Sequence, residues 1–184
     1  MKIHIFGASG SGVTTLGNAL ANKLNIPYFD SDNYFWEPSD PPFTKRRAPD
    51  KRNQLIKEAM QPQDDWILGG SIINWGTTVF PAFDLIVFLW IPAEIRMERL
   101  KNREQERYGD IIFTDPGRNS LFNEFIAWAE DYDNDTGIAN RTLNAHQNWL
   151  KQQRSPILML KENYTTDERM EMILNVLVEK GFLN

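Results

Sequence analysis

The sequence contains no cysteine and only two histidines. The lack of cysteine excludes thiol catalysis, disulfide frameworks and zinc sites built on thiolates, and two histidines leave little for an imidazole metal cluster. A chain of 184 residues buries enough surface to fold without disulfides or a structural metal. The lack of cysteine is most simply explained if the protein resides in a reducing compartment.

Long apolar runs and surplus positive charge are missing as well. The longest apolar run, 85–91, is far shorter than the roughly 20 residues of a membrane-spanning helix, and the first six residues lead into glycines without a signal-peptide core. With 20 Lys and Arg against 25 Asp and Glu, the net charge of −5 argues against broad binding to nucleic acids or anionic membranes. We therefore expect a soluble cytoplasmic protein without nucleic-acid or membrane partners, and the sequence leaves its oligomeric state open.

Strand-like and helix-like segments alternate through most of the chain. The expected strands are 2–6, 28–30, 66–68, 85–90 and 156–160. Helical periodicity begins at 14, about 50 and 93, and marks 121–132, 143–150 and 170–178. A proline-rich stretch, 38–49, predicts a shaped loop. The alternation predicts an α/β fold with a doubly wound parallel sheet, whose ligand site lies at the carboxyl ends of the strands.

A glycine-rich loop follows the first strand. Residues 7–15 read G-A-S-G-S-G-V-T-T and match the Walker A pattern G-x-x-x-x-G-K-[S/T] except that Val13 replaces the lysine. Backbone amides and the helix start can still bind an anion, and Thr14 stands where a hydroxyl reaches a phosphate-bound magnesium ion. The missing charged hydrogen bond is worth roughly 1.5–3 kcal/mol. The predicted nucleotide-binding residues are Gly7, Ser9, Gly10, Ser11, Gly12, Val13, Thr14 and Thr15.

The loop, the segments 28–32, 66–71 and 84–100, and the last strand and helix together resemble the small P-loop kinases, closest to the adenylate-kinase-like group. The resemblance covers most of the chain. It implies a P-loop NTPase three-layer fold with about five parallel strands in the order 2-3-1-4-5, and ATP with Mg²⁺ as cofactors. Residues 1–184 would form a single domain, with an acceptor-binding arm over about 33–62 and a helical lid over about 103–154.

Two aspartates end the second strand. Asp30 and Asp32 lie at i and i+2, so both can point toward a ligand if the chain stays extended. Their spacing resembles the D-x-D of shikimate- and gluconate-type kinases, which implies that Asp30 supports Mg²⁺ and Asp32 holds or deprotonates the acceptor. A solvated turn with an Asx cap is the alternative. Adenylate kinases usually carry an aspartate at the end of the third strand, where this chain has Gly69 and Gly70 and no carboxylate. We expect Gly70 to let the substrate approach the backbone closely.

The helix after Pro92 can gather Arg96, Arg99, Arg103 and Arg107 on one face, since they fall at i, i+3, i+7 and i+11. Because like charges repel, such a cluster indicates a polyphosphate site. The resemblance implies that Arg99 and Arg103 stack on adenine and touch phosphates, and we predict these two and Arg107 as catalytic residues. The alternative is a solvent-facing charged helix.

A basic cluster, Lys45, Arg46 and Arg47, follows the prolines in the region that resembles the monophosphate-binding arm. It is predicted to grip the phosphate or carboxylate of the acceptor. A further hypothesis is that one of these cations supplies the charge absent at Val13. A solvated basic turn is the alternative.

Aromatic residues mark the lid segment. We expect Trp128, Tyr132 and Trp149 to pack in the core rather than stack on a base. His146 shares a face with Trp149, which favours a packed histidine over a general base. Three aspartates at 131, 133 and 135 superficially suggest a calcium loop, but the glycine at its sixth position and the glutamate at its twelfth are missing.

These patterns together predict Mg²⁺-dependent transfer of the γ-phosphoryl group from ATP to a small acceptor, in the first place a nucleoside monophosphate. Val13 favours a second hypothesis, a nucleotide-binding regulator that retained the pocket and lost catalysis. A shikimate- or gluconate-type metabolite kinase is a further alternative.

Overall fold

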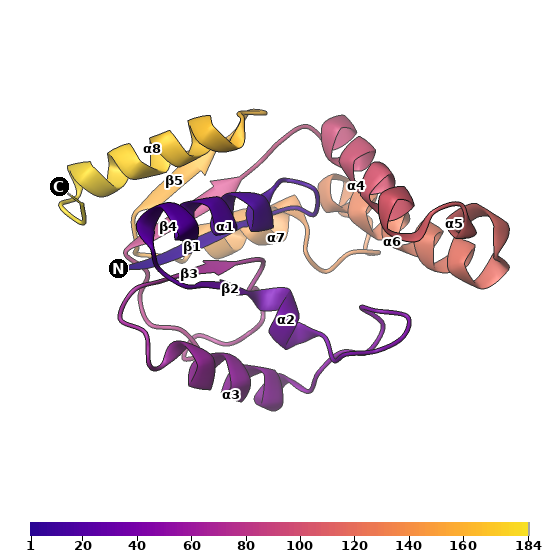
Figure 1. Ribbon diagram of the computed structural model, residues 1–184, viewed down its shortest axis with the longest axis horizontal. Coiled ribbons are helices and arrows are strands. Elements are labelled where there is room, and N and C mark those ends of the chain that lie inside the picture. The colour runs from indigo at the N-terminus through magenta and orange to yellow at the C-terminus, as the bar shows by residue number, and fades with distance from the viewer. Residues whose placement is uncertain (184) are drawn as a thin grey trace.

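The computed structural model describes residues 1–183, in which five strands alternate with eight helices (Figure 1). The strands are β1 (Lys2–Gly7), β2 (Tyr28–Asp30), β3 (Trp66–Gly69), β4 (Leu85–Leu89) and β5 (Ile157–Leu160). The helices are α1 (Val13–Leu24), α2 (Ser31–Phe35), α3 (Pro49–Met60), α4 (Ala93–Tyr108), α5 (Ile111–Thr114), α6 (Pro116–Asn134), α7 (Leu143–Lys151) and α8 (Thr166–Glu179). Within residues 1–183, no helix has both the length and the apolar character that crossing a bilayer requires.

All five strands are parallel and lie in the order β2-β3-β1-β4-β5. The predicted fold class and strand order are therefore confirmed. In the register of the sheet, Ile5 of β1 lies between Gly69 of β3 and Val87 of β4. The carboxyl ends of the central strands consequently meet at one edge, where the glycine-rich loop begins.

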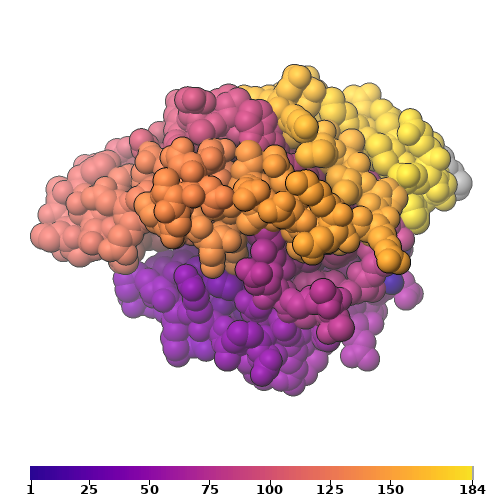
Figure 2. Space-filling model, turned by 180° about the vertical axis from the view of Figure 1, so that it is seen from behind, coloured from indigo at the N-terminus to yellow at the C-terminus, as the bar shows by residue number. Residues whose placement is uncertain are grey.

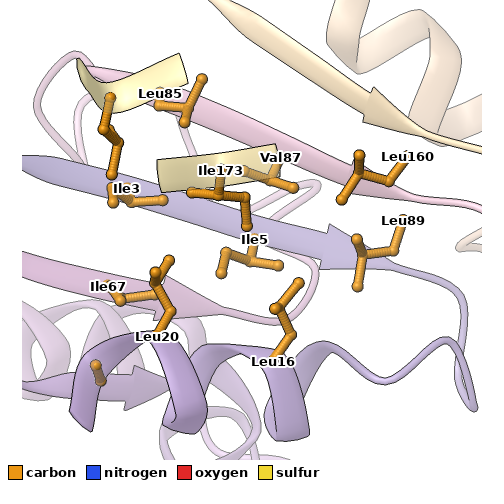
Figure 3. Packing of buried hydrophobic residues seen from close by; sticks show 12 residues of the cluster. Ile3, Ile5, Leu16, Leu20, Ile67, Leu85, Val87, Leu89, Leu160 and Ile173 are labelled. Atoms are coloured by element: carbon orange, nitrogen blue, oxygen red, sulfur yellow. The ribbon is translucent and has the colours of Figure 1, made fainter. Parts of the chain in front are cut away.

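The sheet divides the core into two layers. Side chains alternate along β1, so Ile3 and Ile5 face α1 and α8, as Figure 3 shows with Leu16, Leu20 and Ile173. The opposite face of the sheet carries a second cluster, which α3 and α7 cover through Ile56, Met60 and Leu150. Both faces of the parallel sheet are therefore covered by helices, and this explains why its strands are apolar throughout.

Two insertions extend beyond the sheet edge. One is the predicted arm, in which α2 leads into a loop closed by a bridge between Trp36 and Arg46 and then into α3. The other is a helical excursion, α4 to α6, that projects away from the sheet in Figure 1. It has its own small core of Met97, Leu100 and Ala129. Two short helices, α2 and α5, were not expected from periodicity, because five and four residues are too few to show it.

Two glycines set the distance between α1 and the sheet. A Cβ atom on Gly17 of α1 or on Gly69 of β3 would lie closer than 3.0 Å to the ring of Tyr28. The ring of Tyr28 is thus packed against both glycines. We expect Gly17→Ala to lower the free energy of unfolding by about 1–3 kcal/mol, as overpacking of a core does. Urea denaturation followed by circular dichroism measures this loss.

Gly117→Ala is the matched control for this prediction. A Cβ on Gly117, in the first turn of α6, would meet its nearest neighbour, an oxygen of Asp115, at an ordinary 3.4 Å. The free energy of unfolding of Gly117→Ala should stay within about 0.5 kcal/mol of the wild-type value or rise slightly, because alanine favours the helical conformation. If both variants unfold at the same urea concentration, the ring of Tyr28 is not packed as described.

Candidate active site

The glycine-rich loop curls at the carboxyl edge of the sheet. Gly10 and Gly12 adopt φ angles of 80° and 91°, which other residues rarely reach. Ser11 N donates to Ala8 O at 3.1 Å, and α1 begins at Val13 with its first turn closed by the Leu16 N to Gly12 O bond of 3.0 Å. The loop therefore places free amides and a helix start beside the same cavity.

That cavity has a volume of about 630 Å³. It is lined by the glycine-rich loop, by residues that follow β2 and β3, and by residues of α4, α6 and α8. Figure 2 shows the salmon and orange segment above the violet arm, with a notch between their surfaces. Nearly every predicted nucleotide-binding residue lines it. These are Gly7, Ser9, Gly10, Gly12, Val13, Thr14, Thr15, Arg99 and Arg103. Ser11 is the exception, because its side chain is fully buried under the loop.

Val13 lines the cavity and also packs against the hydrophobic core. Its side chain contacts the apolar cluster beneath α1 and is half-buried. The position thus belongs both to the cavity wall and to the core.

Thr14 and Asp30 come together at the edge of the cavity. Thr14 Oγ1 donates to Asp30 Oδ2 at 3.0 Å, and the Tyr28 hydroxyl donates to the same oxygen at 3.3 Å. Asp30 Oδ1 accepts the backbone amide of Asp32 at 3.0 Å and so caps α2. The helix cap and the approach to the cavity, treated above as alternatives, therefore coexist in one carboxylate.

The hydroxyl and carboxylate oxygens of this pair suit a hard cation such as Mg²⁺. Among residues 1–183 there is no cluster of three or more metal-ligating side chains. A magnesium ion bound by Thr14 and Asp30 would take its other ligands from water and from phosphate, as Mg²⁺ commonly does.

Asp32 lies in the first turn of α2. The extended chain that we expected after the second strand is therefore not found. The turn follows from the Asp30 cap, which starts a helix at Ser31. Both aspartates nevertheless line the first cavity. The surrounding arm and lid raise the pKa of Asp32 by desolvation and the Asp30 carboxylate raises it further, although the side chain remains 52% exposed toward the cavity. Arg141 Nη1 lies 3.9 Å from Asp32 Oδ1 and opposes that rise.

The four arginines of α4 do not share one environment. Arg99, Arg103 and Arg107 line the cavity. Arg96 is buried instead, forms an ion pair with Asp133 of α6, and donates to Ile91 O at 3.3 Å. The expectation that all four line one face is therefore wrong for Arg96, because it anchors α4 to α6.

The remaining three arginines connect different parts of the site. Arg99 Nη2 donates to Asn163 Oδ1 at 2.8 Å, in the loop before α8. Glu104 lies 3.4 Å from Arg103 and 3.8 Å from Arg107. The guanidinium of Arg107 also stacks 5.6 Å above the ring of Phe43 in the arm. Helix α4 and the loop of the arm are therefore in contact.

A second, smaller cavity of about 250 Å³ opens beside the arm. Two members of the predicted basic cluster, Arg46 and Arg47, line it. Lys45 is exposed, forms an ion pair with Glu37, and lines neither of these two cavities. None of the three lines the first cavity, so the structure does not bring the proposed replacement for the missing lysine to the loop.

Two further arginines complete the second cavity and were not among the predicted site residues. Arg52 of α3 donates to Asn74 O at 3.0 Å and lies 4.3 Å over the ring of Trp75. Arg141 stacks 4.7 Å over Phe35 and lines both cavities. Neither follows a motif, so only the fold shows that arginines 46, 47, 52 and 141 surround one space.

Gly70 and Ser71 lie where adenylate kinases usually carry the third-strand aspartate. Gly70 has a φ of 91°, and a Cβ there would collide with the hydroxyl of Ser31. Both residues line the first cavity. The close approach of two chain segments explains the glycine at this position.

A buried polar chain runs from Ser71 into the lid. Nε2 of His146 lies 3.1 Å from Ser71 Oγ, and its Nδ1 lies 2.9 Å from the Tyr132 hydroxyl. Burial, together with the charge of Arg141, lowers the pKa of His146 to about 3. His146 is therefore a neutral histidine packed in the interior. The sequence favoured this interpretation over a general base. Tyr132 is buried, whereas Trp128 and Trp149 are half-buried.

Known proteins that are similar in sequence or in fold include kinases. A family model described as "AAA domain" matches residues 3–120. The uncharacterised protein YqaC of Bacillus subtilis (strain 168) is 38% identical, over 96% of this chain and 97% of that protein. Cytidylate kinase 2 of Borreliella afzelii is 24% identical, over 80% of this chain and 90% of that protein. The crystal structure of shikimate kinase from Aquifex aeolicus superposes with a TM-score of 0.55 at 19% identity, over 100% of both chains, and shows the fold alone.

Proposed function

Because the chain belongs to the AAA-domain family of P-loop, kinase-like proteins, we propose that it transfers the γ-phosphoryl group of ATP to a small anionic acceptor. The observation that supports this most directly is the junction of the two cavities. Arg141 lines both, and Asp32 lies at 3.9 Å from it on the side of the glycine-rich loop. A donor beside the loop and an acceptor anion among the arginines would meet at Asp32.

The donor half of the site is assigned to the first cavity. The amides of the loop would surround the phosphates, while Arg99, Arg103 and Arg107 would close over them from α4. Thr14 and Asp30 would hold magnesium, which neutralises charge on the phosphates when it is bound. Catalysis would then rest mainly on positioning and on charge.

The acceptor half is assigned to the second cavity. Arginines 46, 52 and 141 stack on aromatic rings, and Arg47 donates to the carbonyls of Asn33 and Tyr34. These contacts hold the four guanidinium groups in place for a phosphate or a carboxylate. A nucleoside monophosphate is the first acceptor to test, as the similarity to a cytidylate kinase suggests. A hydroxy acid, such as a shikimate- or gluconate-like compound, is the second, because the raised pKa of Asp32 suits a general base for a hydroxyl group.

The test is a coupled assay of ADP release with MgATP. The acceptors are the nucleoside monophosphates and a set of hydroxy acids and sugar acids. Turnover with one class identifies the acceptor chemistry. Saturable ATP binding without turnover for any acceptor would contradict a phosphotransferase and would support the regulator that Val13 suggests.

Arg141→Met tests the division of the site into two halves. We expect the KM for the acceptor to rise about 10- to 150-fold, because one hydrogen bond to a charged group is lost, while the Kd for ATP stays the same. Steady-state kinetics and calorimetry measure the two quantities. Arg154→Met is the control, since Arg154 is exposed and lines neither cavity. An equal loss of ATP affinity in Arg141→Met would place this arginine in the donor half instead.

A further inference from the structure

Arg169 reaches the glycine-rich loop from the opposite side of the chain. It lies in α8, and its Nη1 donates to the carbonyl of Ser11 at 2.7 Å. A Cβ on Gly12 would lie only 3.2 Å from the same nitrogen. The guanidinium group is therefore packed against the loop one residue before Val13, and it also lines the first cavity.

The charge of Arg169 has no counter-ion in the described part of the chain. Its side chain is only 4% exposed, and no carboxylate of residues 1–183 lies within ion-pair distance. Two carbonyls, those of Ser11 and Glu162, accept from its Nη atoms, and the buried Nε has no partner. Burying an unpaired charge is unfavourable, so this arrangement calls for an anion.

The first cavity is where such an anion can bind. The loop amides, the start of α1 and the guanidinium groups of Arg99 and Arg169 all face it. Burial lowers the pKa of Arg169 and the charge of Arg99 lowers it further, yet arginine stays protonated in proteins, whereas a lysine so placed would lose its proton more readily. The identity of the residue thus fits a cation that must remain charged while buried.

We propose that Arg169 supplies, from α8, the positive charge that the lysine of the Walker A pattern would otherwise bring to the phosphates of the nucleotide. This inference rests on the proposed function and names the residue that compensates for Val13. It also explains why the loop keeps its glycines and Thr14 although the lysine is absent. The φ of 91° already favours glycine at position 12, and a Cβ there would also shift the guanidinium group of Arg169 by a few tenths of an ångström.

Calorimetry with ATP, adenosine and inorganic tripolyphosphate tests the proposal on four proteins: wild type, Arg169→Met, Val13→Lys and the double variant. Arg169→Met should weaken ATP and tripolyphosphate binding about 10- to 150-fold, the effect of one charged hydrogen bond, and leave adenosine binding unchanged. Val13→Lys should recover most of that loss in the double variant and add less to wild type, because the two cations act on one ligand. Arg154→Met is again the control.

The melting temperature distinguishes this proposal from a merely structural role of Arg169. If the proposal is correct, the ligand-free Arg169→Met protein should melt at or above the wild-type temperature, since a buried charge without a counter-ion is removed. A lower melting temperature together with a loss that Val13→Lys does not recover would overturn the proposal, as would unchanged ATP affinity in Arg169→Met.

The proposed function fails in a distinguishable way. A wild-type protein that binds neither ATP nor tripolyphosphate would overturn both ideas before any variant is made. Binding that depends on Arg169 but yields no ADP with any acceptor would contradict phosphoryl transfer alone and would support the role of Arg169.

Discussion

Asp32→Asn is expected to lower kcat about 10²- to 10⁴-fold on an acceptor that offers a hydroxyl group, because it removes the general base. With a nucleoside monophosphate the loss should be smaller, since a phosphate oxygen attacks without first giving up a proton. ATP affinity should remain close to the wild-type value with either acceptor. The coupled assay and calorimetry together measure these three quantities.

The pH profile provides a second readout for Asp32. Its pKa is raised, so the acid side of the kcat/KM profile should lie at a higher pH than that of an ordinary aspartate, and this limb should disappear in Asp32→Asn. Asp64→Asn is a matched control, because Asp64 is exposed and precedes β3 at the opposite edge of the sheet. An unchanged kcat on a hydroxyl acceptor would show that Asp32 takes no part in proton transfer.

Acidification is expected to destabilise the fold well above the pH at which most carboxylates titrate. Burial lowers the pKa of His4 to about 4 and that of His146 to about 3, from an ordinary 6.5. Both histidines are neutral in the folded protein and gain a proton on unfolding. The contribution of the two histidines to the free energy of unfolding is therefore complete above pH 6.5. It is lost as the pH falls from 6.5 toward the pKa values of the folded protein.

The size of this effect follows from the linkage. Each histidine contributes about 1.4 kcal/mol per pH unit in this window, so the free energy of unfolding should be about 4 kcal/mol lower at pH 5 than at pH 7. Urea denaturation across this range measures the slope. His4→Gln and His146→Gln should each remove about half of the slope, whatever they do to stability at pH 7. A slope that neither variant changes would show that other groups cause the acid sensitivity.

The sheet and the loop could be predicted because their signals are local. Each strand is a short apolar run that ends at a turn residue, and Gly7, Gly10 and Gly12 with Thr14 reproduce a motif whose geometry depends on backbone amides. The strand order came with the resemblance to P-loop kinases, and the sheet confirms it. The arm and the lid as separate units, and the roles of single residues in them, stay predictions.

The rest of the site depends on contacts between distant segments, which no local pattern reveals. Arg169 meets Ser11 across 158 residues of sequence, and Arg141 meets Asp32 only after α6 has turned back toward the arm. Arg96 looked like its neighbours on α4, but Asp133 lies beside it in three dimensions. Charge alone cannot tell a buried anchor from a ligand-binding arginine, since both have the same spacing along a helix.

The position of Arg141 between the two cavities bears on how ATP would be protected from water. The guanidinium group of Arg141 lies 3.9 Å from the Asp32 carboxylate and also lines the second cavity. An incoming acceptor anion would compete for the guanidinium group and free the carboxylate at the moment when a nucleophile is present. Wasteful hydrolysis would then be suppressed by the acceptor's absence, without any change in the glycine-rich loop.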